Sequence, residues 1–303
     1  MRISLVDFSQ LVIASVSAQA DDIRGTDGKS MVKHIALNQI LALKKRFKSK
    51  LILCCDSSTY WRKDIFPAYK GHRKFAKEKA KAKGGTFLDF DLVYESITEL
   101  KVELAENFTY PVLEVYNAEA DDIIACLCKY FSENEFITHG LFEEPQEIVI
   151  SSTDGDFQQL QKYQNVQQWN NVTKQMMVCK NPKEFLIGHI CTGDAGDNVP
   201  NICTGTDWAE ARARGESVRA KSFFTKREDA FAKNGIDACE SEAERVNYMR
   251  NDELINLDKI PTKIYEKIIN TYTNYIVTGN KSKVFAYLGE HRMKLLLSEY
   301  QSF

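Results

Sequence analysis

The chain of 303 residues is long enough to bury a substantial core, and its 44% hydrophobic and 27% charged residues are typical of a globular protein. No run approaches the roughly 18 apolar residues of a membrane-spanning helix, so we do not expect a membrane protein. The net charge of −2 gives no overall basic excess. Any attraction for a polyanion therefore has to come from locally concentrated charge.

The eight cysteines do not have the spacing of a zinc site. None forms a C-x-x-C pair, and the chain has only five histidines. Most cysteines stand in apolar runs such as Leu51–Cys55 (LILCC), where a free thiol behaves as a small hydrophobic group. We therefore expect reduced thiols in the core of a cytosolic protein.

The N-terminal segment Leu11–Ala20 (LVIASVSAQA) loosely resembles the apolar part of a signal peptide. Polar residues at Asp7, Ser9 and Gln10 interrupt the apolar stretch. We expect Ile3–Phe8 to form a buried strand of a protein that is not secreted.

Over the first 180 residues, short apolar runs alternate with longer segments whose apolar residues recur at helical spacing. Strands that alternate with helices are typical of a parallel, doubly wound α/β sheet. In chain order the predicted elements are the strand Ile3–Phe8, the helix Ser30–Lys48, the strand Leu51–Cys55, the helix Asp89–Phe108, the strand Val112–Val115, the helix Glu119–Phe131 and the strand Glu147–Ser151.

After residue 180 the pattern becomes mainly helical, and we expect this part to pack with the α/β part as one body. The predicted helices are Pro182–Cys191, Ser217–Lys233, Ser241–Asn251, Pro261–Tyr272 and Lys281–Tyr300.

Positive charge is concentrated in one short segment. Between Arg62 and Lys83 there are nine basic residues against two acidic ones. A local field of this kind attracts and orients a polyanion. For the lysines of Ala76–Lys83 alone, a solvated helical surface is the favoured interpretation.

Each predicted strand is followed by carboxylates near its C-terminal end. In chain order these residues are Asp7, Asp56, Glu119, Asp121, Asp122, Asp154 and Asp156. Because the carboxyl ends of parallel strands lie along one edge of a sheet, residues far apart in the sequence converge there. A further pair, Asp194 and Asp197, follows the predicted helix Pro182–Cys191.

Carboxylates gathered in this way repel one another unless a cation neutralises them. A ligand set of oxygens without His or Cys suits Mg²⁺ or Mn²⁺, and two such ions can clamp the attacking water and the leaving oxygen of a phosphodiester. Taken singly, each aspartate is equally typical of a turn or a helix cap. Five such sites with two paired motifs favour a metal cluster.

The acidic motifs VDFS, CCDSS, YNAEADD, SSTDGDFQQL and GDAGDNV resemble, in order and spacing, those of the 5′-nuclease (flap endonuclease) superfamily. The segments Tyr60–Lys63 and Ala68–Arg73 are most similar to members from T-even bacteriophages. The resemblance implies a PIN-like α/β nuclease core over residues 1–180, with a helical arch over 57–88. It also implies a mainly helical DNA-binding region over 181–303.

The resemblance implies two metal groups that hold two Mg²⁺ ions, with Mn²⁺ able to substitute. The first group is Asp7, Asp56, Glu119 and Asp121, and the second is Asp154, Asp156 and Asp197 with Asp194 beside them. Asp154 is expected between the two groups. Asp122 is expected to be an outer-sphere residue or a charge at a helix N-terminus.

In the arch of this superfamily a single-stranded 5′ end passes above the metals. The resemblance implies that Lys70 and Arg73 reach the scissile phosphate, that Arg62 supports them and that Tyr69 stacks on a base. Cations that neutralise phosphate charge and aromatic rings that stack on unpaired bases suit these roles.

The chain departs from the superfamily pattern after Asn198, where the Gly-Ile-Gly hairpin that holds a monovalent cation is missing. The resemblance therefore does not support a bound K⁺. An Arg-rich segment is the candidate replacement for contact with the duplex backbone, and a solvated loop is an equal alternative. Its basic residues are Arg212, Arg214, Arg219, Lys221, Lys226 and Arg227. Only six residues precede Asp7, so we do not expect an acidic N-terminal extension for binding a sliding clamp.

The function implied is a 5′→3′ exonuclease, flap endonuclease and ribonuclease H in phage DNA replication. Expected substrates are branched or flap DNA and RNA–DNA hybrids, and the expected partner is a single-stranded DNA-binding protein. We expect a monomer in the host-cell cytoplasm. The alternatives are a branch-binding protein without catalysis, which should have lost carboxylates, and a PIN-type ribonuclease, which would not need the arch.

Overall fold

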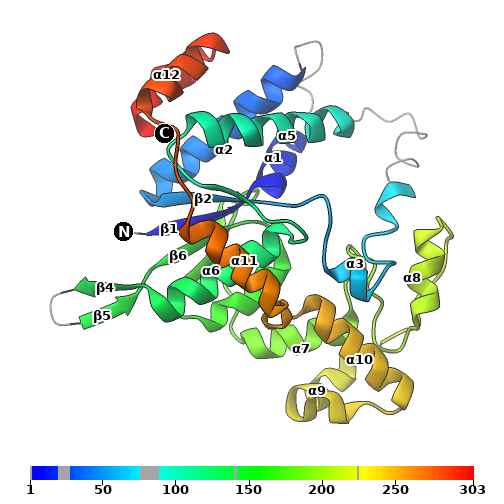
Figure 1. The fold of residues 1–303 in the computed structure, drawn as a ribbon. Coiled ribbons are helices and arrows are strands. Elements are labelled where there is room, and N and C mark those ends of the chain that lie inside the picture. The colour runs from blue at the N-terminus through cyan, green and yellow to red at the C-terminus, as the bar shows by residue number, and fades with distance from the viewer. Residues whose placement is uncertain (1, 20–27, 76–88, 140–141, 224) are drawn as a thin grey trace.

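A six-stranded sheet forms the centre of the molecule (Figure 1). The computed structural model describes residues 2–19, 28–75, 89–139, 142–223 and 225–303. In spatial order the strands are β3 (Val112–Glu114), β2 (Lys50–Cys55), β1 (Ile3–Asp7), β6 (Ile148–Ser151), β7 (Val166–Asn170) and β8 (Gln175–Met177). The first five are parallel, and β8 runs antiparallel to β7. The predicted α/β class with a mainly parallel sheet is confirmed.

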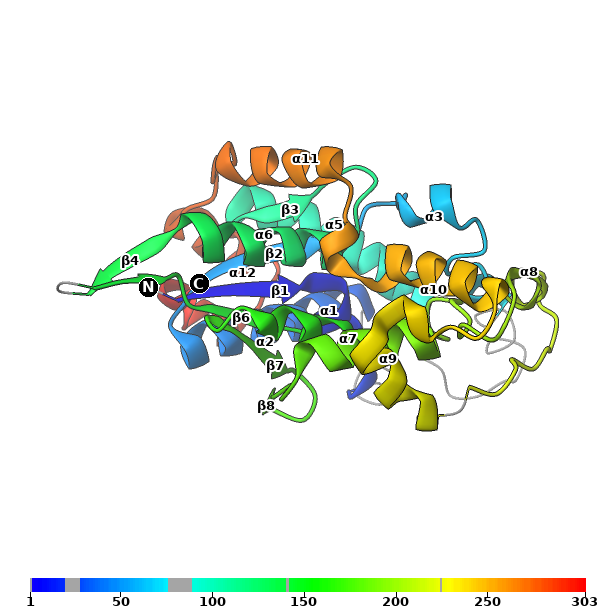
Figure 2. The same cartoon turned by 90° about the horizontal axis from the view of Figure 1, so that it is seen from below.

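Helices cover both faces of the sheet (Figures 1 and 2). On one face lie α1 (Phe8–Ser17), α2 (Gly28–Phe47), α5 (Phe90–Asn107) and α12 (Lys281–Glu290), and on the other lie α6 (Ala120–Asn134) and α11 (Thr262–Thr273). Successive strand residues point to opposite faces. Val6 accordingly belongs to the first hydrophobic layer, and Leu5 belongs to the second.

The remaining elements lie around these two helical layers, and the hairpin among them projects from the amino end of the sheet, beside the N-terminus (Figures 1 and 2). These elements are α3 (Arg62–Ile65), the hairpin β4 (Phe136–His139) and β5 (Phe142–Pro145), η1 (Gly155–Lys162), α7 (Pro182–Thr192), α8 (Thr206–Ala213), η2 (Thr225–Arg227), α9 (Glu228–Asn234), η3 (Gly235–Ala238), α10 (Glu242–Ile255), η4 (Leu257–Lys259), α13 (Lys294–Leu297) and η5 (Tyr300–Ser302). No helix among the described residues is long and apolar enough to cross a membrane.

The first strand is shorter than predicted, because a helix begins directly after it. The side chain of Asp7 caps α1 by accepting a hydrogen bond from the backbone amide of Gln10 at 3.2 Å. The apolar stretch that resembles a signal peptide is thus mostly the buried side of α1. All eight cysteines are free, as expected.

The predicted helix Ser217–Lys233 is wrong over its first half, where residues 217–223 form neither helix nor strand. Side chains hold this stretch in another path: Asn201 donates a hydrogen bond to the carbonyl of Lys221 (2.8 Å), and the Lys221 amide donates to the hydroxyl of Thr204 (2.9 Å). Four short strands, β4, β5, β7 and β8, have no counterpart among the predictions.

The loop that carries the last acidic pair is held by a buried asparagine of α10. The amide of Asn251 donates to the carbonyls of Ile190 and Pro200, each at 2.8 Å, and none of its side chain is exposed. It thereby joins α10 to the end of α7 and to the chain just after Asp197. A buried carbonyl without a donor costs about 1–3 kcal/mol.

We predict that Asn251→Ala lowers the free energy of unfolding by about 2 kcal/mol, because the carbonyl of Ile190 loses its side-chain donor and that of Pro200 keeps only the donor from Arg250. Urea denaturation followed by circular dichroism measures this change. The control is Asn270→Ala on the exposed face of α11, which should change stability by less than about 0.5 kcal/mol. Equal stability of the two variants would show that Asn251 does not hold the loop.

Candidate metal centre

The strand order changes direction between β1 and β6, since β2 and β3 follow β1 on one side while β6 and β7 lie on the other. Ligands of open α/β sheets bind beyond the carboxyl ends of the strands at such a switch point. Asp7 ends β1 there, and Asp154 caps η1 directly after β6. The topology therefore brings acidic residues from distant parts of the sequence to one edge.

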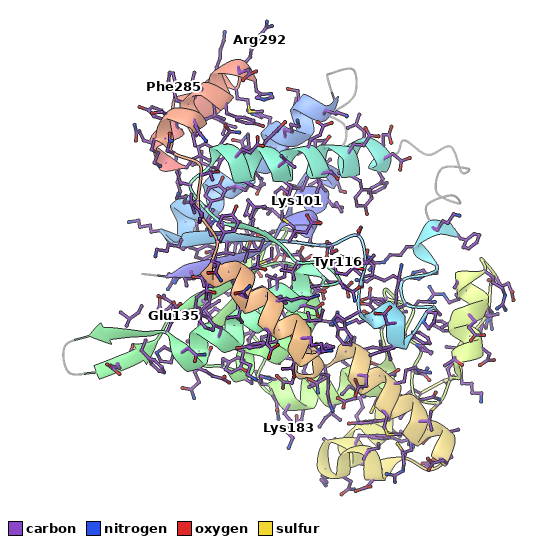
Figure 3. The ribbon with its side chains drawn as sticks, in the orientation of Figure 1. Lys101, Tyr116, Glu135, Lys183, Phe285 and Arg292 are labelled. Carbon is purple, nitrogen blue, oxygen red and sulfur yellow. The ribbon has the colours of Figure 1, made fainter. Side chains whose placement is uncertain are left out.

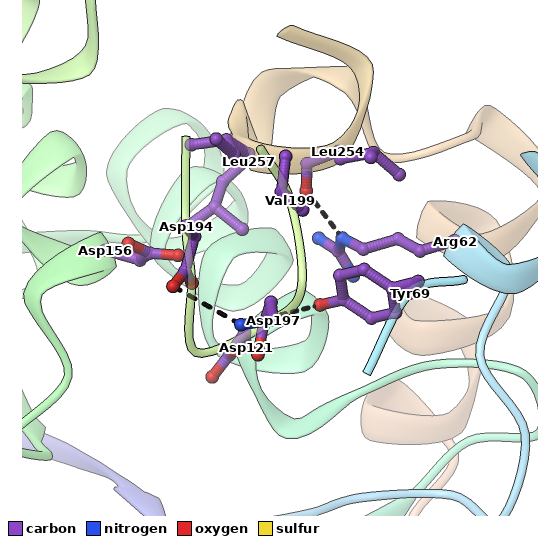
Figure 4. A pocket seen from close by; sticks show the side chains of 10 residues that line it. Arg62, Tyr69, Asp121, Asp156, Asp194, Asp197, Val199, Leu254 and Leu257 are labelled. Carbon is purple, nitrogen blue, oxygen red and sulfur yellow. Dashed lines mark hydrogen bonds between the residues drawn. The ribbon is translucent and has the colours of Figure 1, made fainter. Parts of the chain in front are cut away.

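Two cavities at this edge contain all eight carboxylates predicted as metal ligands. The larger, of about 680 Å³, is lined by Asp7, Asp56, Glu119, Asp121 and Asp154. The smaller is lined by Asp121, Asp156, Asp194 and Asp197, together with Arg62 and Tyr69 (Figure 4). Because Asp121 lines both cavities, the eight side chains form one acidic cluster.

Several of these carboxylates carry charge that the protein does not neutralise. Burial, and then the charge of Asp56, raise the pKa of Asp7 to about 7. Burial and Asp156 raise the pKa of Asp154 to about 6, and burial with Asp154 raises the pKa of Asp121 well above its usual value. A nearby divalent cation would oppose all three shifts, because its charge favours the ionised carboxylates. The donor set therefore fits such an ion.

Hydrogen bonds orient the carboxylates at the strand ends. Asp7 accepts from the hydroxyl of Ser152 at 3.0 Å in addition to the amide of Gln10. Asp56 accepts from the backbone amide of Ala120, the first residue of α6, at 3.0 Å. Bonds of this kind hold metal ligands in a fixed direction before an ion arrives.

Asp197 differs from the other carboxylates because cations already surround it. The guanidinium of Arg73 and the hydroxyl of Tyr69 each donate to it at 2.6 Å, and the ammonium of Lys70 lies 3.4 Å away. Burial raises the pKa of Asp197, but the charges of Lys70 and Arg73 outweigh it, so the pKa is lowered. Glu119 is likewise paired, with Lys70 and Arg62.

Arg62 lies inside the protein, with only 3% of its surface exposed. It pairs with Glu119 at 2.7 Å and with Asp122 at 2.8 Å, and it donates to the carbonyl of Leu254 at 2.8 Å. Asp122 is the third residue of α6 and belongs to its capping box, which fits the predicted helix N-terminal charge. A residue this enclosed has no surface for nucleic acid, so any support that Arg62 gives to Lys70 and Arg73 comes through its pairs with acidic residues.

Tyr69 is equally buried, with 3% of its surface exposed. Its hydroxyl reaches Asp197 and Glu119, and its ring packs edge-on against Tyr60, with centroids 6.5 Å apart. No ring face is open for a base, so the predicted stacking does not fit this position. Tyr60 is less buried and lines the larger cavity.

Lys70 and Arg73 line the larger cavity together with five carboxylates of the acidic cluster. Lys70 has a φ of 55°, and its backbone amide donates to the carbonyl of Asp197 at 2.8 Å. A Cβ atom at Gly71 would lie 2.8 Å from that of Ala213, so α8 packs directly against this turn. The side chain of Arg73 is 56% exposed. The lysines of the predicted arch from Lys77 to Lys83 lie outside the described residues.

His189 is a member of the cluster that the sequence patterns did not indicate. Its Nε2 lies 2.8 Å from Oδ1 of Asp156, and ligand atoms of Asp156, His189 and Asp194 lie within 4.8 Å of one another. Burial lowers the pKa of His189, but Asp156 and Asp194 outweigh it and raise the pKa. Its place in the last turn of α7, five residues before Asp194, is the signal that could have identified it.

In the Arg-rich segment, one arginine is hydrogen-bonded to the loop around Asp197 and others are exposed. Arg212 donates to the carbonyl of Ala195 (3.2 Å) and to the side chain of Asn198 (3.1 Å), and it thus supports the loop around Asp197. Arg214 and Arg219 are exposed, and Arg214 pairs with a neighbouring acidic residue.

Comparison with known proteins places the chain in a family. Residues 2–186 match the family model described as the 5′-3′ exonuclease N-terminal resolvase-like domain, and residues 183–303 match that of T4 RNase H, C terminal. The chain is 32% identical over 311 aligned positions to ribonuclease H of Enterobacteria phage T4, covering 99% of this chain and 95% of that protein.

Solved structures from phage T5 share the fold. A T5 D15 flap endonuclease pseudo-enzyme–product complex with DNA and metal ions matches with a TM-score of 0.62 and 18% identity, and T5 D15 protein co-crystallised with metal ions matches with 0.55 and 17%. Each match covers 91% of this chain and 99% of the other. The chain belongs to the 5′-3′ exonuclease family and is a nuclease, a hydrolase that cuts phosphodiester bonds.

Proposed function

We propose that the protein is a divalent-metal-dependent, structure-selective nuclease with 5′→3′ exonuclease, flap endonuclease and ribonuclease H activity. Its substrates are branched or flap DNA and RNA–DNA hybrids that arise in phage DNA replication, and it acts as a monomer in the host-cell cytoplasm. The similarity to a phage ribonuclease H supports this role. The proposed partner is a single-stranded DNA-binding protein.

One observation carries the proposal: a cluster of eight carboxylates with uncompensated charge lies directly beside the cations Lys70 and Arg73. Two Mg²⁺ ions, or Mn²⁺ in their place, are the proposed cofactors, and neighbouring T5 structures contain metal ions. Such ions supply an activated water and neutralise charge on the phosphate. The proposed ligands are Asp7, Asp56, Asp121, Asp154, Asp156, Asp194 and Asp197, with Glu119 beside the first group.

The residues of the chain have separate tasks in this proposal. Lys70 and Arg73 neutralise charge that develops on the scissile phosphate, since both line the larger cavity beside the carboxylates. Arg62 is a positioning residue, because its pairs with Glu119 and Asp122 fix the basic segment to α6. Tyr69 has a similar task through its bond to Asp197.

We also propose a division of labour along the chain. Residues 1–180 carry out the cleavage, and residues 181–303 hold the duplex part of the substrate. Arg214 and Arg219 are the proposed phosphate contacts, because their side chains are exposed beside α8. Arg212 supports them from behind by bracing the loop at Ala195 and Asn198.

We predict that Asp154→Asn abolishes cleavage and leaves the fold and substrate binding largely intact, because the amide keeps the shape and removes the charge of a metal ligand. The measurement is cleavage of end-labelled flap DNA and RNA–DNA hybrid, with Mg²⁺ and with a chelator. The control is Asp237→Asn at an exposed aspartate that pairs only loosely, at 3.3 Å. Near-wild-type cleavage by Asp154→Asn in Mg²⁺ would exclude this residue as a required ligand.

For Lys70 we predict a catalytic defect. Removal of its ammonium by Lys70→Ala should lower the single-turnover rate by about 100-fold or more, because the scissile phosphate loses a neutralising charge. Rapid-quench kinetics with saturating enzyme measures that rate. Lys63→Ala, at an exposed lysine of the same segment, is the matched control. A change confined to KM would make Lys70 a binding residue only.

For the Arg-rich segment we predict a change in salt dependence. Replacement of Arg214 and Arg219 by Gln should flatten the log–log slope of affinity against salt by about 1.8, since each lost phosphate contact contributes about 0.9. Fluorescence anisotropy with a flap that has a long duplex arm measures the slope, and binding of single strands should stay unchanged.

The control for this experiment replaces Arg292 and Lys294, two exposed cations that follow α12 in the chain, and Arg292 lies well away from α8 (Figures 1 and 3). Their replacement by Gln removes the same net charge from the protein. If both double variants have the wild-type slope, the Arg-rich segment is a solvated loop and the duplex is held elsewhere.

A further inference from the structure

The smaller cavity contains a nitrogen donor among its oxygen donors. His189 stands in the last turn of α7, which packs against η1. This packing brings the imidazole beside Asp156 of η1, with Nε2 of His189 2.8 Å from Oδ1. Asn181 caps the start of α7 by accepting from the amide of Glu184, so the helix that presents the imidazole is well anchored.

The loop after α7 brings Asp194 close to the side chains of His189 and Asp156. Gly193 has a φ of 69°, and a Cβ atom there would lie 2.5 Å from the carbonyl of Val199, so this turn needs glycine. The turn sends the chain back so that Asp194 faces Asp156 and His189, with ligand atoms of the three residues within 4.8 Å of one another. Among the described residues, no other set of three such side chains comes this close.

The contact between His189 and Asp156 is not an ordinary buried ion pair. Its distance is short, yet its geometry is not that of a hydrogen bond, and Nε2 is enclosed without a hydrogen-bond partner among the described residues. One imidazolium could not neutralise Asp156, Asp194 and Asp154 together. The surplus of negative charge around a nitrogen that has no hydrogen-bond partner is the arrangement that a bound dication satisfies.

We infer that Nε2 of His189 is a direct ligand of the metal ion held by Asp156 and Asp194, which makes this a mixed nitrogen and oxygen site. The inference rests on the proposed metal dependence. An imidazole nitrogen suits transition-metal ions such as Zn²⁺ and Fe²⁺ better than it suits Mg²⁺, whereas oxygen ligands alone suit Mg²⁺ and Mn²⁺. The two ions of this nuclease are therefore held with different selectivity: the Asp7 and Asp121 side takes Mg²⁺, and the His189 side prefers a transition-metal ion.

The test is the pulsed EPR spectrum of untagged, full-length protein loaded with Mn²⁺. Electron spin echo modulation from a coordinated ¹⁴N nucleus should appear and should change to the ¹⁵N pattern when the protein is labelled with ¹⁵N-histidine. His189→Gln should lose the modulation, because an amide oxygen replaces the nitrogen. His34→Gln, on α2 in the other helical layer, should keep it.

Metal titration by calorimetry gives a second measurement on the same proteins. His189→Gln should weaken Mn²⁺ binding at one of two sites by about tenfold and change Mg²⁺ binding by about twofold at most. Two bound Mn²⁺ ions without nitrogen modulation in the wild type would overturn the inference and leave the proposed nuclease intact. Absence of any Mn²⁺ binding would overturn both, and the wild-type ¹⁴N and ¹⁵N spectra decide the matter even if a variant does not fold.

Discussion

Mutual repulsion of closely spaced carboxylates is the constraint around which this protein is built. Eight acidic side chains meet at one sheet edge, and the structure compensates only part of their charge. Asp197 and Glu119 are neutralised from within, by Lys70, Arg73 and Arg62. Asp7 and Asp154 are not neutralised in this way, and burial together with neighbouring negative charge raises their pKa values. The fold thus confines the unmet charge to the place where ions and phosphate come together.

The ion pairs inside the protein also explain why the basic segment that begins at Arg62 does not present one uniform positive surface. Its first cation, Arg62, is buried against the start of α6, whereas Arg73 keeps more than half of its side chain exposed. The basic segment is therefore attached at its base and offers charge further along. A cation that is held in place before the substrate arrives loses little entropy when it meets a phosphate.

Four of the six strands of the sheet, β1, β2, β3 and β6, could be predicted because they are short and mainly apolar and because carboxylates follow them closely. Contacts between segments that are far apart in the sequence could not be predicted in this way. Nothing in the local pattern around Lys221 shows that Asn201 and Thr204 will take its backbone hydrogen bonds and prevent a helix. His189 belongs to the site only because α7 packs on η1, and the burial of Arg62 depends on α6 and α10. The periodicity and spacing of residues in a sequence do not predict the roles that side chains acquire through tertiary packing.

The contact between Gly71 and Ala213 links two parts of the chain that would otherwise be free to vary separately. Gly71 lies between the cations at the acidic cluster, and Ala213 ends the helix beside the Arg-rich segment. Larger side chains at either position would push α8 away and change the spacing between α8 and the acidic cluster. The exposed residues after α8 can therefore be replaced without disturbing this contact, whereas a larger side chain at Gly71 needs a smaller one at position 213 to make room for it.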